Sequence, residues 1–200
     1  MTPGLRYLPG HLSLGDQRKL VETLRSAVAV APLVTPVMPR TGRPFTVRMT
    51  NLGALGWVSD RAGYRYQATH PETGKPFPPI PEMVLDVWRQ VSGYPHDPQA
   101  CLVNYYQGGA KMGLHRDEDE EDFAAPVVSI SLGDTAVFRI GGPERGGKTE
   151  TLKLASGDVL VMGGESRLCY HGIDRVLTGT STLLKDGGRI NLTLRRVTKP

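Results

Sequence analysis

The chain has 200 residues, of which 39% are hydrophobic and 22% are charged. This is the size and composition of one globular domain, and it is too apolar for an intrinsically disordered protein. The net charge of +4 permits an anionic partner but is far below that of a polybasic tail. The longest uncharged stretch, residues 26–39, is too short to span a membrane and is interrupted by Pro32 and Pro36, so we expect no membrane contact.

The cysteines and the first residues bear on the cellular compartment. Cys101 and Cys169 form no CxxC pair, and residues 1–10 lack the charged and apolar regions of a secretory signal. We therefore expect a cytoplasmic protein with reduced cysteines, and we expect it to be a monomer.

Two amphipathic helices are predicted in the N-terminal half of the chain. The first covers about residues 12–30, with Ser13 or Asp16 as its N-cap, and the second covers about residues 81–92. Apolar residues recur at helical spacing in both, namely Leu20, Val21, Leu24 and Val28 in the first and Val84, Val87, Trp88 and Val91 in the second. The proline-rich segments 31–44 and 70–81 are predicted to be a loop and an extended surface segment.

From residue 100 onward, short runs rich in β-branched residues alternate with glycine-containing turns. These runs cover residues 101–106, 127–132, 135–140, 151–155, 158–163, 167–171 and 189–197. Six or seven short strands at this spacing predict a sandwich or barrel. The predicted fold class is therefore mainly β with flanking helices (α+β), in a single domain.

A histidine and a carboxylate two residues apart offer two ligands for a divalent metal. In an extended strand, His115 and Asp117 point to the same face. On its own this pattern is more typical of a surface loop or a hydrogen-bonded pair. His171 ends a predicted strand in the same β-rich region, and two histidines with one carboxylate form the facial triad of non-haem Fe(II) oxygenases. The cysteines have no spacing suited to a structural zinc site.

The predicted strand at 189–195 has one apolar and one polar face. Ile190, Leu192 and Leu194 alternate with Arg189, Asn191, Thr193 and Arg195. The polar face belongs either to an edge strand exposed to solvent or to a strand that lines a polar cavity. In a cavity the two guanidiniums need anions, and a short dicarboxylate satisfies both. Asn104 and Tyr106 share a face of another strand and can orient a carboxylate or keto acid by hydrogen bonds.

These motifs occur in a fixed order, N-x-Y-x-x-G at 104–109, H-x-D at 115–117, His171 and R-x-N-x-T-x-R at 189–195. In this order they resemble the AlkB-type Fe(II)/2-oxoglutarate-dependent dioxygenases, and segments 54–66, 125–142 and 157–173 resemble the bacterial DNA-repair branch of that family. The resemblance covers most of residues 45–197. It implies a double-stranded β-helix (jelly roll) core at 100–197, an N-terminal helix and loop at about 1–45, and a nucleotide-recognition lid at 46–70.

The resemblance also implies a role for each motif residue. His115, Asp117 and His171 match the iron ligands. The residues that match the 2-oxoglutarate contacts are Asn104, Tyr106, Arg189, Asn191 and Arg195, with Arg189 at the distal carboxylate and Arg195 near the carboxylate that chelates iron. The residues that match the base-recognition site are Trp57, Tyr64 and Asp119, for which the alternative is core packing of the two aromatics.

The segment around the H-x-D motif departs from the family pattern at two positions. Arg116 and Glu118 replace the side chains typical of the bacterial repair branch, and both are expected to point away from the metal. Apart from Asp119, the acidic residues of segment 118–122 are expected in a solvated loop.

The implied activity is oxidative demethylation of bases such as 1-methyladenine and 3-methylcytosine, with Fe(II), O2 and 2-oxoglutarate, releasing formaldehyde, succinate and CO2. The implied partner is DNA, with RNA as an alternative, presented single-stranded or with the base flipped out. Candidate phosphate contacts are Arg48, Arg61, Arg65, Lys111 and Arg145. Two other functions stay open at this point: a 2-oxoglutarate dioxygenase with a non-nucleic-acid substrate, and a catalytically silent nucleic-acid-binding jelly roll.

Overall fold

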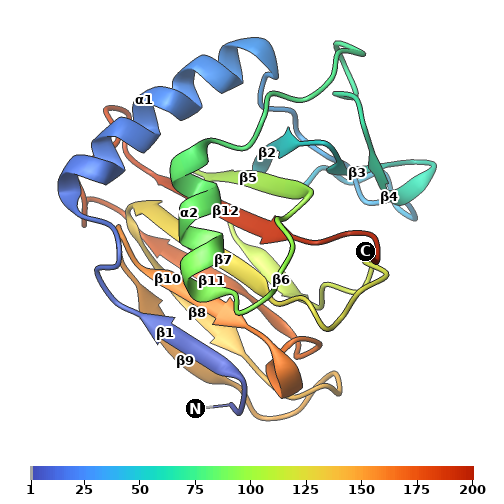
Figure 1. Cartoon of the computed structure of the whole chain (residues 1–200), viewed down its shortest axis with the longest axis vertical. Helices are drawn as coiled ribbons and strands as arrows, with labels where there is room; N and C mark the ends of the chain where they lie inside the picture. Colours follow the sequence, from blue (N-terminus) through green and yellow to red (C-terminus); the bar gives the residue numbers. More distant parts are fainter. Residues whose placement is uncertain (1) are drawn as a thin grey trace.

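A computed structural model describes residues 2–200, and two antiparallel sheets packed face to face make up its centre (Figure 1). The larger sheet contains, in spatial order, β1 (Leu5–Leu8), β10 (Val159–Met162), β7 (Val127–Gly133), β12 (Arg189–Arg195), β5 (Ala100–Tyr106) and β2 (Arg48–Gly53). The smaller sheet contains β6 (Met112–His115), β11 (His171–Leu177), β8 (Thr135–Ile140) and β9 (Glu150–Leu154). This is the predicted double-stranded β-helix, in a mainly β chain with flanking helices.

Two helices cover the outer face of the larger sheet, and both predicted helices are confirmed. They are α1 (Leu14–Val30), whose N-cap Ser13 accepts a hydrogen bond from the Asp16 amide, and α2 (Glu82–Val91). Apart from Val28, which is half-buried and outside this cluster, the predicted apolar residues of both helices lie in one buried cluster with the outward-facing side chains of the sheet, including Leu20, Leu24, Val84, Trp88, Val103, Ile130 and Leu192. Burial of each such side chain contributes about 1.5–3 kcal/mol, so the sheet and helices stabilise one another. Among residues 2–200, no helix is both long enough and apolar enough to cross a membrane.

Strand β12 lies in the middle of the larger sheet, between β5 and β7. Leu192 and Leu194 face the helices, whereas Asn191, Thr193 and Arg195 face the space between the two sheets. The predicted two-faced strand is therefore an interior strand, and the alternative of a solvent-exposed edge strand is wrong.

A hairpin made of β3 (Gly56–Asp60) and β4 (Gly63–Gln67) forms a separate two-stranded sheet. The Asn51 side chain holds it to β2, because its amide donates to the Trp57 carbonyl at 2.9 Å and its oxygen accepts from the Trp57 amide at 3.0 Å. The predicted lid boundaries of 46–70 need correction, since residues 48–53 form β2 of the larger sheet. Of the three strands within residues 46–70, only the two strands of the hairpin lie outside both main sheets.

The predicted strand at 167–171 is wrong. A 3-10 turn at Gly164–Ser166 opens this segment, and the strand starts only at His171 and runs to Leu177. Gly164 has a φ of 52°, a left-handed conformation that interrupts an extended chain. Of its apolar side chains, Cys169 is buried whereas Leu168 and Tyr170 are half-buried, so the segment is partly buried without forming a strand.

Candidate metal centre

Three potential metal ligands converge between the two sheets. The ligand atoms of His115, Asp117 and His171 all lie within 4.8 Å of one another. His115 ends β6 and His171 begins β11, and the two residues are paired directly across these strands. A side chain at Gly172 would meet the Met112 carbonyl oxygen at 2.5 Å, so a glycine here permits β6 to approach β11. The local sequence His-Gly therefore helps to bring the two imidazoles together.

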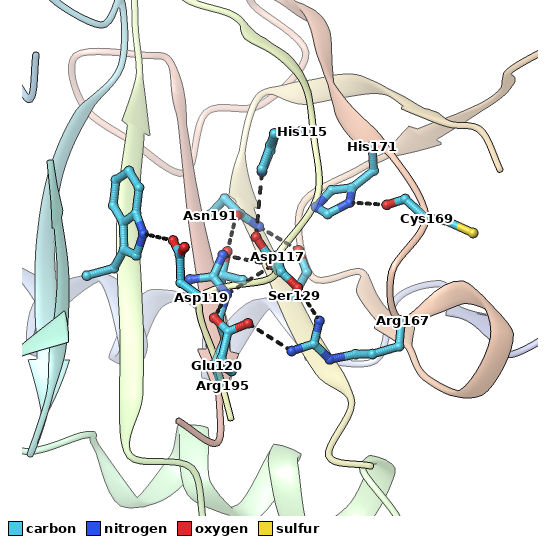
Figure 2. A network of polar contacts seen from close by, with 12 residues as sticks. His115, Asp117, Asp119, Glu120, Ser129, Arg167, Cys169, His171, Asn191 and Arg195 are labelled. Atoms are coloured by element: carbon cyan, nitrogen blue, oxygen red, sulfur yellow. Dashed lines mark hydrogen bonds and ion pairs between the residues drawn. The ribbon is translucent and has the colours of Figure 1, made fainter. Parts of the chain in front are cut away.

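The hydrogen bonds of both imidazoles leave one ring nitrogen available to a metal. His115 Nδ1 lies 2.9 Å from the Gly113 carbonyl oxygen, and His171 Nδ1 lies 3.0 Å from that of Cys169 (Figure 2). A carbonyl oxygen only accepts hydrogen bonds, so each Nδ1 carries the proton and each Nε2 carries a free lone pair. Such second contacts orient metal-binding histidines.

Asp117 reaches this site from a loop and not from a strand. Strand β6 ends at His115, so the predicted alternation of side chains along one strand does not position Asp117. Two buried arginines do so instead. Arg195 donates from Nε to Asp117 Oδ2 at 2.9 Å, and its Nη2 forms an ion pair with the same oxygen, also at 2.9 Å. Arg167 donates to the Asp117 backbone carbonyl at 2.7 Å. Asp117 Oδ1 lies 3.7 Å from His115 Nε2.

The electrostatics of the triad suit a divalent cation. Burial by itself raises the pKa of Asp117, but Arg195 and the two imidazoles outweigh burial and hold the pKa well below its usual range. Burial, followed by the neighbouring His115, lowers the pKa of His171 to about 4. At neutral pH, Asp117 is therefore charged and His171 is neutral. Two imidazoles and one carboxylate are the donor set of non-haem Fe(II) sites.

A cavity of about 520 Å³ adjoins the triad. All eleven residues that the sequence marks as site residues line it: Trp57, Tyr64, Asn104, Tyr106, His115, Asp117, Asp119, His171, Arg189, Asn191 and Arg195. They come from both main sheets, the hairpin and the loop after β6. The fold thus gathers side chains that are far apart in the sequence around one space.

Arg189 is a cation without a buried counter-charge in contact. It is fully buried, and its hydrogen-bond partners within residues 2–200 are neutral: Ser131 Oγ at 2.9 Å and the Leu154 carbonyl at 3.3 Å. Its Nε has no partner, and burial lowers its pKa to about 10. An unpaired buried cation is costly, so this end of the cavity is suited to an anion.

Other polar groups around the cavity also remain available. Asn104 Oδ1 and Arg195 Nη1 have no hydrogen-bond partner within the described residues. Burial raises the pKa of Tyr106 to about 12, so its hydroxyl stays protonated and can donate. The Asn191 amide, in contrast, is already engaged by Ser129 Oγ at 2.7 Å and Thr193 Oγ1 at 2.9 Å. Arg189, Arg195 Nη1 and the Tyr106 hydroxyl thus offer the charge and the donors that a dicarboxylic keto acid requires, whereas Asn104 Oδ1 is an acceptor.

Aromatic side chains of the hairpin form the opposite wall. Trp57 and Tyr64 stack with ring centroids 5.4 Å apart and an angle of 19° between the rings. Trp57 Nε1 donates to Asp119 Oδ2 at 2.8 Å, and Tyr64 is 51% exposed. Core packing therefore does not describe Tyr64, whose ring is open to solvent, whereas Trp57 both packs against the apolar cluster between the sheets and donates to a charged group.

The sequence patterns do not identify two residues beside the triad, Glu120 and Arg167. Glu120 and Asp122 are buried, so the expected solvated loop is wrong for both. The Glu120 carboxylate pairs with Arg167 at 3.0 Å. No local pattern marks Glu120, but an arginine inside the apolar run before His171 was an available signal for Arg167.

Arg116 and Glu118 lie at the cavity wall, where they pair with each other. The Arg116 guanidinium also lies over the Tyr170 ring, 5.5 Å from its centroid. From the sequence, both are expected to point away from the metal, but both side chains reach the edge of the cavity.

Comparisons with known proteins agree with this site. The family model of the 2OG-Fe(II) oxygenase superfamily matches residues 4–195. The chain is 52% identical to an alpha-ketoglutarate-dependent dioxygenase AlkB homolog of Caulobacter vibrioides over 98% of this chain and 89% of the relative. It is 42% identical to the alpha-ketoglutarate-dependent dioxygenase AlkB of Escherichia coli over 90% of this chain and 85% of the relative.

A solved structure gives the same result. The structure of OsALKBH1 superimposes with a TM-score of 0.80 at 33% identity and covers 98% of this chain and 99% of that one. The donor set of the triad and the unpaired cation of the cavity fit Fe(II) and 2-oxoglutarate. The chain therefore belongs to the 2OG-Fe(II) oxygenase superfamily, and within it to the AlkB-type dioxygenases that use Fe(II), 2-oxoglutarate and O2.

Proposed function

We propose that this dioxygenase demethylates alkylated nucleic-acid bases, such as 1-methyladenine and 3-methylcytosine in DNA, and that RNA is a further substrate. The observation that carries the proposal is the stacked pair Trp57–Tyr64 beside Asp119, on the wall of the cavity that holds the triad. Both lesions are planar cations. An aromatic face contributes about 0.5–2 kcal/mol to binding of a cation, and a neighbouring carboxylate adds to this.

Names of more distant relatives support a nucleic-acid substrate. An Arabidopsis thaliana relative, 32% identical over 98% of this chain and 49% of its own length, is named a DNA N(6)-methyladenine demethylase. A Schizosaccharomyces pombe relative, 32% identical over 70% of this chain, is named a tRNA demethylase.

In the proposed mechanism, His115, Asp117 and His171 hold Fe(II) through two imidazole nitrogens and one carboxylate oxygen. Arg189 neutralises the distal carboxylate of 2-oxoglutarate, while Arg195, Asn104 and Tyr106 orient the rest of the cosubstrate. Asn191, which lines the same cavity, contacts the cosubstrate in this proposal in place of one of its partners Ser129 and Thr193. Bound Fe(II), with 2-oxoglutarate and O2, supplies the oxidant that hydroxylates the methyl group, with loss of formaldehyde, succinate and CO2. The apolar walls of the cavity exclude water from this chemistry.

The hairpin β3–β4 acts as the nucleotide-recognition lid in this proposal. A base inside a duplex cannot reach the cavity, so the substrate is single-stranded or presents a flipped base. Methylation at a Watson–Crick nitrogen weakens pairing and lowers the cost of extrusion. We further propose that the enzyme is a single-domain monomer and acts in the cytoplasm. Arg48, Arg61, Arg65, Lys111 and Arg145 are the proposed phosphate contacts.

Mass spectrometry tests the proposal. An oligonucleotide with one 1-methyladenine is incubated with the enzyme, Fe(II), 2-oxoglutarate and air. We expect loss of one methyl group and formation of one succinate for each base repaired, and no reaction with Asp117→Ala. Turnover of 2-oxoglutarate without demethylation of DNA or RNA indicates a different substrate. No turnover, together with no charge-transfer band with anaerobic Fe(II) and 2-oxoglutarate, indicates a catalytically silent protein. Either outcome contradicts the proposal.

A further inference from the structure

Four buried charged side chains lie beside the metal centre and contact one another. They are Asp117, Glu120, Arg167 and Arg195, and each side chain is only 2–6% exposed (Figure 2). Two positive and two negative charges balance in this cluster, so each depends on the others for compensation. Removal of one member disturbs the rest, including the metal ligand Asp117.

Glu120 contacts both arginines that position Asp117. One of its carboxylate oxygens accepts from Arg167 at 3.0 Å, and the other lies 3.5 Å from Arg195 Nε. Arg195 holds the Asp117 carboxylate, and Arg167 holds the Asp117 backbone. Glu120 therefore contacts both arginines that hold Asp117, and Arg195 Nε faces both carboxylates.

The hairpin is joined to this cluster through Tyr66 of β4. The Tyr66 hydroxyl donates to the Glu120 carboxylate, at the same oxygen that faces Arg195. Burial raises the pKa of Tyr66 far above its usual value, Arg195 opposes this rise, and the Glu120 and Asp117 carboxylates add to it. The hydroxyl is therefore protonated and acts as a donor.

Trp57 and Tyr66 are directly opposite each other across the hairpin. Trp57 binds Asp119, and Tyr66 binds the next residue, Glu120. One pair of facing hairpin residues thus holds two consecutive acidic residues of the loop that carries Asp117. This arrangement leaves the hairpin and the loop little freedom to move independently.

We propose that Tyr66 and Glu120 are positioning residues that couple the hairpin to the metal centre through Arg195 and Asp117. Tyr66 does not touch the metal. It holds Glu120, which orients Arg195, which in turn orients the Asp117 carboxylate. Coupling between two sites is reciprocal, so occupation of the metal centre also stabilises the hairpin. This inference rests on the metal centre of the family and not on the identity of the substrate.

Metal binding and hydrogen exchange test the coupling without turnover. The full chain is titrated with Mn²⁺ by calorimetry in the absence of oligonucleotide, and amide exchange of residues 56–67 is followed with and without Mn²⁺. We expect Tyr66→Phe to weaken Mn²⁺ binding about fivefold or more, within the usual range of coupling between sites. We also expect Mn²⁺ to slow exchange in the wild-type hairpin but not in the Tyr66→Phe hairpin.

Tyr94→Phe is the matched control. Tyr94 also donates to an acidic residue of the same loop, Asp122, but neither contacts Arg167 or Arg195 among the interactions described for residues 2–200. We expect its Mn²⁺ affinity to equal that of the wild type. Equal loss of affinity in both variants, or none in a folded Tyr66→Phe, overturns the proposal. Glu120→Gln provides a second variant that keeps the shape of the side chain, and it is expected to lose the metal-dependent protection as well.

Discussion

Asp117 directs its two carboxylate oxygens to different partners, because Oδ2 accepts from Arg195 at 2.9 Å while Oδ1 faces His115. The ion pair with Arg195 is buried on both sides. The same carboxylate therefore serves as a candidate metal ligand and as the counter-charge of a buried arginine. Substitution of Asp117 has two separable consequences, one for the metal and one for the fold.

Asp117→Ala is expected to abolish Mn²⁺ binding and also to destabilise the metal-free protein by about 3–5 kcal/mol, since Arg195 loses the nearer of its two carboxylate partners in a buried site. His115→Ala is expected to abolish Mn²⁺ binding too, but its side chain is 41% exposed, so the metal-free protein changes by less than about 1 kcal/mol. Urea denaturation in EDTA measures both. Equal stability losses in the two variants contradict the assignment of Asp117 to Arg195.

Arg189→Met is expected to weaken 2-oxoglutarate binding about 10- to 150-fold, because a hydrogen bond to a charged group contributes about 1.5–3 kcal/mol. The metal-free variant is expected to be at least as stable as the wild type, since the substitution removes an unpaired buried cation. Calorimetry with Mn²⁺ and 2-oxoglutarate gives the affinity, and urea denaturation gives the stability. An unchanged affinity excludes Arg189 as the anion site.

Asp119→Asn is expected to lower kcat/KM about tenfold for cationic 1-methyladenine and to change it little for uncharged 3-methylthymine. The reason is that the substitution removes the negative charge beside Trp57 but keeps an oxygen that accepts from Nε1. Competition between two oligonucleotides, each with one lesion, measures the ratio directly. A similar decrease for both lesions assigns Asp119 to hairpin structure and not to recognition of charge.

At alkaline pH, the contact between Tyr7 and Asp158 is expected to affect the free energy of unfolding. The Tyr7 hydroxyl donates to Asp158 at 2.7 Å, and burial, followed by this carboxylate, raises the pKa of Tyr7 from 10.0 to about 12. The folded state then holds this proton more tightly than the unfolded state. Its contribution to stability is complete below pH 10 and is lost as the pH rises to about 12.

The comparison for this prediction is Tyr7→Phe. Between pH 10 and 12, the urea midpoint of the wild type is expected to fall more steeply than that of the variant, which has no proton to lose at this position. Parallel curves mean that the contact does not contribute to the pH dependence.

Short-range sequence patterns predict those helices and strands that have one uniformly apolar face. The stripe from Leu20 to Val28 and the alternation in 189–195 correspond to α1 and β12, because the buried face alone decides the periodicity. Residues 167–170 include apolar side chains but belong to no strand, so their pattern leads to a wrong strand prediction. Strand β1 is short, and no pattern in the sequence distinguishes it from a loop.

The residues of the site also divide into those that the sequence marks and those that it does not. Ordered motifs mark the predicted metal and 2-oxoglutarate residues, whereas Trp57, Tyr64 and Asp119 are marked only by the resemblance to the AlkB-type family, and the cavity gathers all eleven. Glu120 and Arg167 belong to no such motif. Their burial depends on each other and on Tyr66, which is 54 residues from Glu120 in the chain. A mutual dependence of charges from distant segments leaves no trace in local periodicity, so the cluster becomes visible only in three dimensions.

The position of β12 has a consequence for biosynthesis. This strand follows every other strand in the chain, yet it lies between β5 and β7. As the ribosome releases the polypeptide, both neighbours emerge first and expose edges that invite pairing with other nascent chains. Asp117 has no arginine partner from β12 until that insertion occurs. The enzyme therefore reaches its mature structure only after β12 has inserted into the larger sheet. Chaperones that shield strand edges are expected to increase its yield.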